Sequence, residues 1–333
     1  PGRTAVWLLP SSRTAWFAVL DDGSMIEVEV AEEFELATTP IEPPGTVDTE
    51  DAPPVVVDET VLAGDVARSV FENPLPDTRV ITDGTDLFAL IGPTDRYDHA
   101  VLGDALEASG VEVVRGDGSG SVEVSDVVSV EAPDVIEAVS PMLADVDGDG
   151  ALDIVVTQSN PDSGARIVAY SLDGEMIAAS EPIGTGNRWL NLLAVAPTGP
   201  DGAVEVIAVR TPHIGGTLEF FRENGAGRLE RVATADGYST HVIGSRNLDL
   251  GIVTDADGDG ALDVLLPRQD RAVLAIVTRD DESPTGTREV SSLRLSSEPS
   301  SNVSATGDAE SGISYAVGTA DGRITAWAAP AER

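Results

Sequence analysis

The sequence contains no cysteine and no lysine, and it is poor in aromatic residues. Without cysteine the chain cannot form a disulfide bond, a thiolate metal site or a thiol nucleophile. Aromatic residues make up only 4% of the 333 positions although 41% are hydrophobic, so any core must consist of aliphatic side chains. No run approaches the roughly 18 apolar residues of a membrane-spanning helix, so we expect no transmembrane segment in this chain.

The charge of the chain is strongly one-sided. Aspartate and glutamate number 58 against 20 basic residues, all of them arginine, and the formal net charge is −38. Nucleic acids and anionic lipids are bound through basic patches, so we expect no nucleic-acid partner. An acidic surface attracts divalent cations and keeps the protein soluble. Adaptation to a saline habitat explains such overall acidity, but it does not explain aspartates at a fixed spacing.

Two nearly identical acidic segments stand out, DVDGDGALD at 145–153 and DADGDGALD at 255–263. Calcium binds six to eight oxygen atoms, and aspartates at positions 1, 3, 5 and 9 of a tight loop, with glycine at position 6, supply them well. The predicted ligands are the carboxylates of Asp145, Asp147, Asp149 and Asp153 with the Ala151 carbonyl, and the carboxylates of Asp255, Asp257, Asp259 and Asp263 with the Ala261 carbonyl. The sequence therefore predicts two Ca²⁺ sites.

Other interpretations of these segments fit less well. An EF-hand needs glutamate at position 12, where this chain has Val156 and Leu266. Magnesium demands a stricter octahedron and gives up its water molecules reluctantly. An acidic surface turn without an ion is the remaining alternative, and the occurrence of two copies argues against it. The expected role of the ion is structural, because the loop fills most coordination positions itself.

The acidic segments belong to a longer repeat that reads strand, loop, strand, turn, strand. We compare the repeats by one anchor residue each, defined as the first residue of the second strand. The anchor residues are Asp153, Glu205, Asp263 and Tyr315, at intervals of 52, 58 and 52 residues. Weaker units occupy 4–30 and 79–114. This period predicts an all-β fold, a β-propeller of about six four-stranded blades with five or seven left open, formed by residues 1–333 as one domain. A Pro-rich acidic insertion is expected at about 38–58.

The pattern D-x-D-x-D-G-x-x-D followed by a hydrophobic strand resembles the FG-GAP/VCBS repeat, which also occurs in the integrin α-subunit propeller. The match is specific at 145–156 and 255–266. The resemblance implies a β-propeller with structural calcium between the first two strands of a blade. The sequence departs from the pattern at 197–205 and 306–314, and we expect no complete calcium cage there.

No catalytic residue can be assigned from the sequence. His99, His213 and His241 lie far apart without metal-ligand spacing, so we expect surface or loop positions for them. There is no G-x-S-x-G motif. A lectin stacks sugars on aromatic rings, but packing is the expected role of the four tryptophans.

The expected function is a non-catalytic binding or scaffold protein whose partner is another protein or a glycan. A polysaccharide hydrolase or lyase and a lectin stay open as alternatives. Candidate ligand contacts in loops between strands are Asn187, Arg188, Trp189, Arg210, His213 and Arg246. Because the chain begins at Pro1 rather than Met, we expect a mature, processed or truncated product. The expected location is outside the cell or in the periplasm, after removal of a signal sequence. A membrane anchor upstream of residue 1 stays open.

Overall fold

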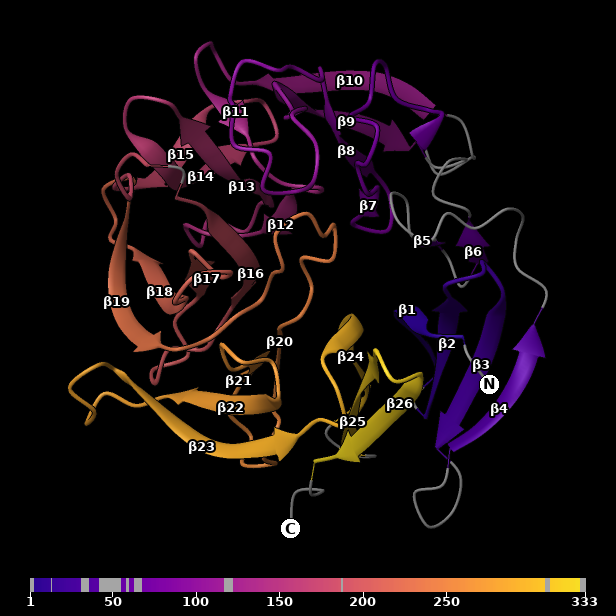
Figure 1. Ribbon diagram of the computed structural model, residues 1–333. Coiled ribbons are helices and arrows are strands. Elements are labelled where there is room, and N and C mark those ends of the chain that lie inside the picture. The colour runs from indigo at the N-terminus through magenta and orange to yellow at the C-terminus, as the bar shows by residue number, and fades with distance from the viewer. Residues whose placement is uncertain are drawn as a thin grey trace.

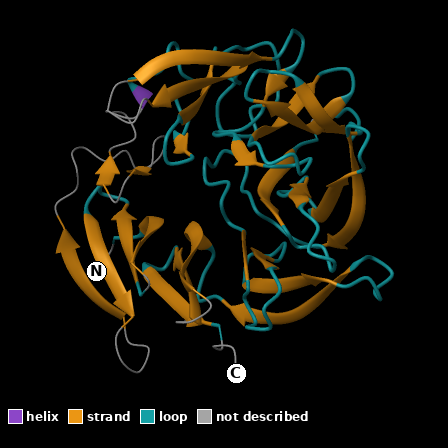
Figure 2. Ribbon diagram, turned by 180° about the vertical axis from the view of Figure 1, so that it is seen from behind, coloured by secondary structure: helices purple, strands orange, loops and turns teal. Residues whose placement is uncertain are grey.

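The chain folds into antiparallel sheets that surround a common centre, as the computed structural model shows (Figure 1). The structure describes residues 3–12, 14–30, 36–41, 55–57, 60–62, 68–116, 122–186, 188–308 and 312–329. Strands and loops make up nearly all of it (Figure 2). No helix among the described residues is long and apolar enough to cross a membrane.

Each sheet is a meander of strands that follow one another in the chain. The first sheet contains β1 (Ala5–Ser12), β2 (Ala15–Leu20), β3 (Met25–Val30) and β4 (Leu36–Ile41). β5 (Val55–Val57) and β6 (Thr60–Leu62) form a two-stranded sheet. The next sheet contains β7 (Ile81–Thr82), β8 (Leu87–Ile91), β9 (Gly110–Gly116) and β10 (Val122–Ser129).

Two further meanders are joined into a nine-stranded sheet by the parallel pairing of β15 with β19. The first consists of β11 (Val135–Ile136), β12 (Met142–Ala144), β13 (Asp153–Asn160), β14 (Gly164–Ser171) and β15 (Met176–Ser180). The second consists of β16 (Leu190–Ala196), β17 (Glu205–Arg210), β18 (Thr217–Glu223) and β19 (Arg228–Asp236).

The chain ends in two more sheets. One contains β20 (Ile252–Thr254), β21 (Asp263–Pro267), β22 (Val273–Arg279) and β23 (Thr287–Arg294). The other has three strands, β24 (Pro299–Asp308), β25 (Gly312–Thr319) and β26 (Arg323–Ala328). Of the insertion predicted at about 38–58, residues 38–41 belong to β4 and 55–57 are β5, and the remainder lies outside the described residues.

The hydrophobic core lies between successive sheets rather than within one central cluster. In β17, Val206 and Ala208 pack toward β13 and β14, whereas Ile207 and Val209 pack toward β21 and β22. Alternate residues of a strand point to opposite faces of its sheet, so a strand covered on both faces is apolar at every position. This explains the continuous aliphatic runs at the second strands of the repeats.

The first and last sheets contact each other through β1 and β24. The Asn302 side chain accepts a hydrogen bond from the Leu8 amide at 2.8 Å and donates one to the Leu8 carbonyl at 2.9 Å. Ala316 of β25 packs into the cluster that contains Leu8 and Trp16. Among the described residues, no apolar cluster joins β1–β4 to β7–β10, where the Arg79 guanidinium lies 4.4 Å from the Trp7 ring centre.

Candidate metal centres

Three loops of equal length occupy the same place in three successive repeats. They connect β12 to β13, β16 to β17 and β20 to β21. Each spans eight residues, 145–152, 197–204 and 255–262. The strands close each loop with the same register, in the pairs Ala144–Asp153, Ala196–Glu205 and Thr254–Asp263. Asp153, Glu205 and Asp263 therefore occupy equivalent positions, as the sequence repeat predicts.

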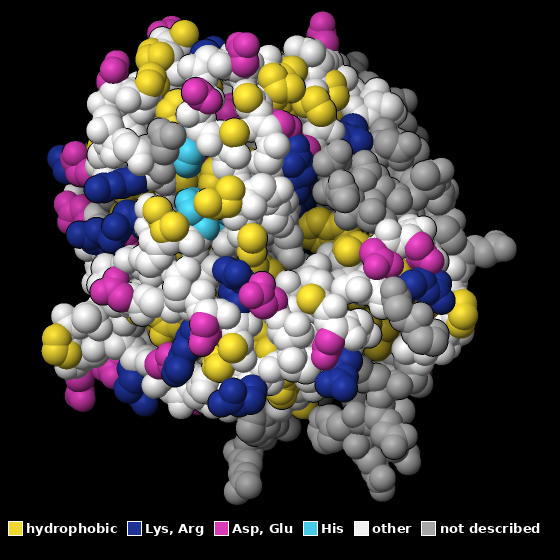
Figure 3. Space-filling view, viewed as in Figure 1, with side chains coloured by type: hydrophobic (Ala, Val, Ile, Leu, Met, Phe, Trp, Pro, Cys, Tyr) yellow, Lys and Arg dark blue, Asp and Glu magenta, His cyan; other side chains and the backbone are white. Residues whose placement is uncertain are grey.

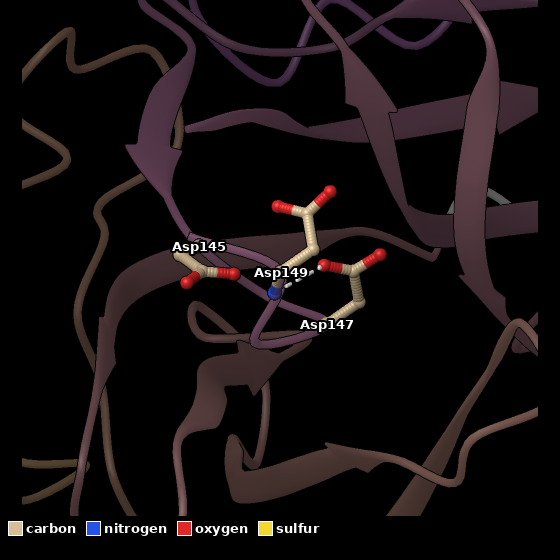
Figure 4. A group of neighbouring side chains, drawn as sticks. All are labelled: Asp145, Asp147 and Asp149. Carbon is tan, nitrogen blue, oxygen red and sulfur yellow. Dashed lines mark hydrogen bonds between the residues drawn. The ribbon is translucent and has the colours of Figure 1, made fainter. Parts of the chain in front are cut away.

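In the first loop three carboxylates converge. One oxygen from each of Asp145, Asp147 and Asp149 lies within 4.8 Å of the others, and the three side chains gather at one end of the loop (Figure 4). The amides of Gly148 and Gly150 donate to Asp145 at 2.7 and 2.9 Å, and both glycines have positive φ. A side chain at these glycines would be strained, so the turn depends on glycine.

Asp153 completes this loop from the start of β13. Its buried carboxylate accepts a hydrogen bond from the Val146 amide at 3.0 Å. Burial raises the pKa of Asp153, and the negative charges of Asp147, Asp149 and Asp145 raise it further. Four acidic groups in this arrangement repel one another, and a cation among them would remove that repulsion.

The third loop also gathers three carboxylates, but here the buried residue at position 9 is one of them. Carboxylate oxygens of Asp255, Asp257 and Asp263 lie within 4.8 Å of one another. Asp263 is 1% exposed, and its Oδ1 has no hydrogen-bond partner among the described residues. Burial, followed by the charge of Asp257, raises the pKa of Asp263 to about 6. A buried oxygen without a partner beside two other carboxylates fits a hard cation, because such a cation supplies the missing partner.

The remaining predicted ligands line the same loops. The Asp149 carboxylate accepts from the Ala151 amide at 2.7 Å, and Asp259 accepts from the Ala261 amide at 2.9 Å. Each of these bonds occupies one carboxylate oxygen and leaves the other for an ion. Asp153 and Asp259 lie outside the two groups of three converging carboxylates, so a bound ion would have to draw them inward.

The middle loop contains an arginine where the other two would hold a cation. It keeps Asp201 at position 5 and Glu205 at position 9, and Arg222 contacts their carboxylates at 3.3 and 2.8 Å. Arg222 lies on β18 across from Glu205, where the other two repeats have Ser171 and Thr278. A guanidinium therefore bridges the two remaining carboxylates.

A second arginine reaches the same carboxylate from the next sheet. Arg279 at the end of β22 contacts Glu205 at 2.9 Å, and their side chains are 4% and 0% exposed. The Thr198 hydroxyl also donates to Glu205 at 2.9 Å. A buried carboxylate with this many charged and polar partners is fully compensated.

The last repeat differs from the prediction. β25 begins at Gly312 and Tyr315 is its fourth residue, so the anchor assigned to Tyr315 is displaced by three positions. Asp308 pairs directly with Gly312, which leaves only residues 309–311 to connect the strands. This connection is shorter than the eight-residue loops of the other repeats.

The six residues proposed as ligand contacts do not form one surface. Asn187 lies outside the described residues, and Arg188 is exposed. Trp189 is buried and donates from Nε1 to the Glu137 carbonyl at 2.9 Å. The indole also packs edge-to-face on His241, with ring centres 4.9 Å apart.

Two of the predicted arginines are held by acidic residues. Arg246 contacts Asp77 at 3.1 Å and Asp104 at 2.6 Å. Arg210 contacts Glu219 at 2.9 Å in a cleft of about 530 Å³ between the ends of the two meanders of the nine-stranded sheet. The arginines of this cleft have acidic partners, which lowers its capacity for an anionic ligand.

The structure also brings together residues that the sequence left apart. His213 and His241 have ring centres 6.0 Å apart, and His99 bonds through Nδ1 to buried Glu137. These histidines lie in connections between strands rather than in a motif, so no spacing in the sequence could reveal their proximity. Arg222 could have been found by its position opposite Glu205, but Arg279 could not, because it comes from the next sheet.

The architecture has counterparts among solved structures. The WD40 β-propeller domain of Doa1 shares 11% identity and a TM-score of 0.52, over 98% of this chain and 93% of that one. The chain is a β-propeller. BamB from Moraxella catarrhalis also matches, with 11% identity, a TM-score of 0.36, and coverage of 95% of this chain and 70% of that one. No family model and no curated protein matches the sequence, so the resemblance to FG-GAP/VCBS repeats stays a prediction.

Proposed function

We propose that this chain is a six-bladed, calcium-stabilised propeller that serves as a non-catalytic binding or scaffold protein outside the cell or in its envelope. The observation that carries the proposal is the pair of equivalent loops at 145–153 and 255–263, each with three carboxylates converging within 4.8 Å. The three-stranded last sheet counts as the sixth blade, held to the first through Asn302.

Calcium suits these loops better than other ions because every donor is an oxygen atom. Calcium accepts flexible coordination by six to eight oxygens, whereas zinc and copper favour nitrogen and sulfur. Asp147 and Asp149 are exposed, which indicates a site in exchange with solvent. Calcium sites of extracellular modules have Kd values of about 10⁻⁴–10⁻³ M, so such a site is filled where calcium is abundant. This supports a location outside the cytoplasm.

A binding role is supported by apolar side chains on the propeller face opposite the loops. Because neighbouring strands are antiparallel, the connections after the first and the second strand of a blade lie at opposite ends. Ile214 lies in the β17–β18 connection, which follows the second strand of its blade, and Val242 and Ile243 lie between β19 and β20. Their side chains are 65%, 40% and 63% exposed. Hydrophobic and histidine side chains gather on this face (Figure 3). An exposed apolar patch is typical of an interaction surface.

The alternatives have less support in the described residues. The cavity beside Glu137 and Trp189 has a volume of about 30 Å³, which holds a water molecule but no sugar ring. The larger cleft of about 530 Å³ beside Arg210 is lined by arginines that are paired with acidic residues. A lectin needs an exposed aromatic platform, and no aromatic residue is among the exposed large hydrophobic side chains of the described segments. Neither a polysaccharide-cleaving enzyme nor a lectin is therefore favoured.

Affinity capture tests the binding role. The protein is immobilised in millimolar calcium and exposed to culture fluid and envelope extracts of the producing cells, beside Ile214→Asp/Ile243→Asp and the control Met176→Asp. Met176 is also exposed, at 52%, but lies on β15 at the rim. We expect a protein or glycan that wild type and control retain and the double variant does not. The proposal would be contradicted if the double variant captured the same molecule as wild type, or if nothing were captured from either extract.

A further inference from the structure

Among the described residues, the last sheet lacks the outer strand that the other blades possess. In the other meanders the third strand pairs with a fourth, as β14 does with β15 and β22 does with β23. The last sheet has the order β24–β25–β26, so β26 forms its edge. This sheet stands between β20–β23 and the first sheet (Figure 1).

β26 is more exposed than the third strands that have a covering neighbour. Six of the eight residues of β14 and five of the seven residues of β18 are buried. None of the six residues of β26 is buried, and the four between Arg323 and Ala328 are half-buried. A fourth strand beside β26 would cover these residues, as β15 covers β14 and β19 covers β18.

The outer edge of β26 carries backbone groups that point away from its own sheet. The Ala329 amide donates to the Ile313 carbonyl at 2.7 Å, and β25 and β26 pair without a register shift. Successive residues of a strand direct their N–H and C=O groups to alternate edges, so those of Ile324, Ala326 and Ala328 point away from β25. Such an edge is a template for a further strand.

A cleft of about 530 Å³ lies between β26 and the first sheet. Ile324 lines it from β26, and Leu20, Ile26 and Val28 line it from the first sheet. The side chains of Ile324 and Ala326 both pack toward that sheet. The volume lies in the range of about 300–1,000 Å³ that is typical of ligand sites. The cleft thus places an apolar wall beside the open edge.

The edge and the wall select the same residues of a strand that lies there. In an antiparallel pair, opposed residues have their side chains on the same face, and every second pair exchanges both backbone hydrogen bonds. A residue opposite Ala326 would therefore direct its N–H and C=O groups at β26 and its side chain toward the first sheet. The site fits an extended segment with apolar side chains at alternate positions.

We infer that the outer edge of β26 and the adjoining cleft bind an extended, basic segment of another protein, which adds the fourth strand of the last blade. The outer strands of the other blades have five to nine residues, which sets the length of this segment. With a net charge of −38, the chain repels a second copy of itself and attracts a segment with lysine or arginine between its apolar residues. Main-chain hydrogen bonds give affinity in this mode of binding, and pockets for alternate side chains give specificity.

This surface is separate from the features that carry the proposed function. The exposed residues Ile214, Val242 and Ile243 lie in the β17–β18 connection and between β19 and β20, and the aspartate loops precede β13 and β21. None of them belongs to the last sheet. Ile214→Asp/Ile243→Asp should therefore bind the added strand as wild type does, and either inference can fail without the other.

The test is a titration of a fluorescent peptide with the full chain in millimolar calcium, followed by fluorescence anisotropy. The peptide has seven residues and blocked ends, with valine at its second, fourth and sixth positions and lysine elsewhere. We expect one peptide per chain. N-methylation of the three valines should weaken binding at least about 10-fold, because it removes the amides that face β26. N-methylation of the two lysines between them should leave binding unchanged.

Changes in the protein test the same edge from the other side. Ala326→Pro removes an N–H group that points outward and leaves the pairing with β25 intact, so it should weaken peptide binding about 10-fold and keep the circular dichroism of wild type. Met176→Asp, on the outer strand of another blade, is the control and should bind as wild type does.

A peptide of the same composition with its three valines adjacent controls for attraction by charge alone, and it should bind at least about 10-fold more weakly. The inference would be overturned by absence of saturable binding, by equal binding of the two peptides, or by equal weakening from both patterns of N-methylation. A dimer of wild type that Ala326→Pro dissociates would also overturn it, because the occupant of the edge would then be a second copy.

Discussion

The loops at 145–152 and 197–204 have the same length and the same strand register, yet they neutralise their acids differently. The first gathers the carboxylates of Asp145, Asp147 and Asp149 with no basic residue among them. The second keeps two acids and places Arg222 between them. On the proposed function, one blade loop is closed by a metal ion and the other by an arginine, and the two loops differ both in their aspartates and in the residue across from position 9.

The two kinds of loop differ in whether their closure needs a cation from solution. An arginine is part of the chain, so the middle blade is complete whenever the protein is folded. In the proposal, the aspartate loops are complete only when a cation is present, because like charges at this spacing repel one another. The comparison predicts that solution calcium controls two blades and leaves the third unaffected.

The largest expected effect is the loss of calcium from both aspartate loops. At a calcium concentration a hundred times Kd, each site adds about 2.7 kcal/mol to the free energy of unfolding. Excess chelator should therefore remove about 5 kcal/mol in total and lower Tm by many degrees. Thermal unfolding followed by circular dichroism measures the change.

Asp147→Ala/Asp257→Ala should unfold at the same temperature with calcium and with chelator. The matched control is Asp162→Ala, an exposed acid in the β13–β14 turn, which should keep the full calcium response. If the Tm of wild type were the same in calcium and in chelator, calcium would not stabilise the fold.

Removing an arginine from the middle blade should have a large effect that calcium does not correct. Arg279→Met leaves the buried Glu205 carboxylate with one fewer charge partner, at an expected cost of about 3–5 kcal/mol. Urea unfolding in calcium measures this cost. Arg288→Met is the control, because that side chain is 62% exposed and its pair with Asp280 should contribute less than about 1 kcal/mol.

The double variant Glu205→Gln/Arg279→Met sharpens the same test. It removes the buried charge together with its partner, so it should lose less stability than Arg279→Met alone. A double variant that is less stable than the single one would show that Arg279 acts mainly by packing over Phe220, whose ring centre is 5.4 Å away.

The middle loop should become a calcium site when its sequence is made to match its neighbours. The required changes are Pro197→Asp, Gly199→Asp, Pro200→Gly, Glu205→Asp and Arg222→Ser. A side chain at residue 199 would now meet an Arg222 nitrogen at 2.5 Å, and the last change removes that contact. Calorimetry should detect a third calcium ion, worth about 2.7 kcal/mol at a hundred times Kd.

The control for this redesign carries the first four changes and keeps Arg222. Its guanidinium occupies the space of the cation, so no third ion should bind. Equal calcium binding by the two variants would show that the arginine does not stand in for a metal.

The smallest expected effect is a pH dependence confined to the calcium-free protein. In chelator the pKa of Asp263 is about 6, above the 3.9 of an unfolded aspartate. The folded state therefore binds the proton first, and stability should increase as the pH falls from 7 to 5. Asp263→Asn should weaken this dependence, and saturating calcium should suppress it in wild type. The measurement is the Tm of wild type and of Asp263→Asn between pH 5 and pH 7, and Asp162→Asn is the control.

The convergence of the aspartates was predictable because all of them lie within nine residues of the chain, whereas their binding of calcium stays a prediction. The repeat fixed the position of Asp153, Glu205 and Asp263 for the same reason, since strand register follows the loop length. Tyr315 was misplaced because the last repeat has a short turn in place of the eight-residue loop.

Other parts of the molecule depend on contacts that the linear sequence does not express. Arg279 reaches Glu205 over 74 residues, from a different blade. The three histidines lie in connections between strands, as predicted, but these connections carry no periodic signal, so the packing of His213 on His241 could not be predicted from the sequence. Blade order places these residues together, and the blade period alone does not determine which loops meet.

The most direct test of the calcium account is a calorimetric titration of chelator-treated, dialysed protein with Ca²⁺ at pH 7. Two calcium ions should bind to wild type, one to Asp147→Ala and none to Asp147→Ala/Asp257→Ala, while Arg222 keeps the middle loop free of calcium. Fewer than two ions in wild type, or two ions in the double variant, would contradict the claim that these two loops, and not the loop closed by arginine, are the calcium sites of the propeller.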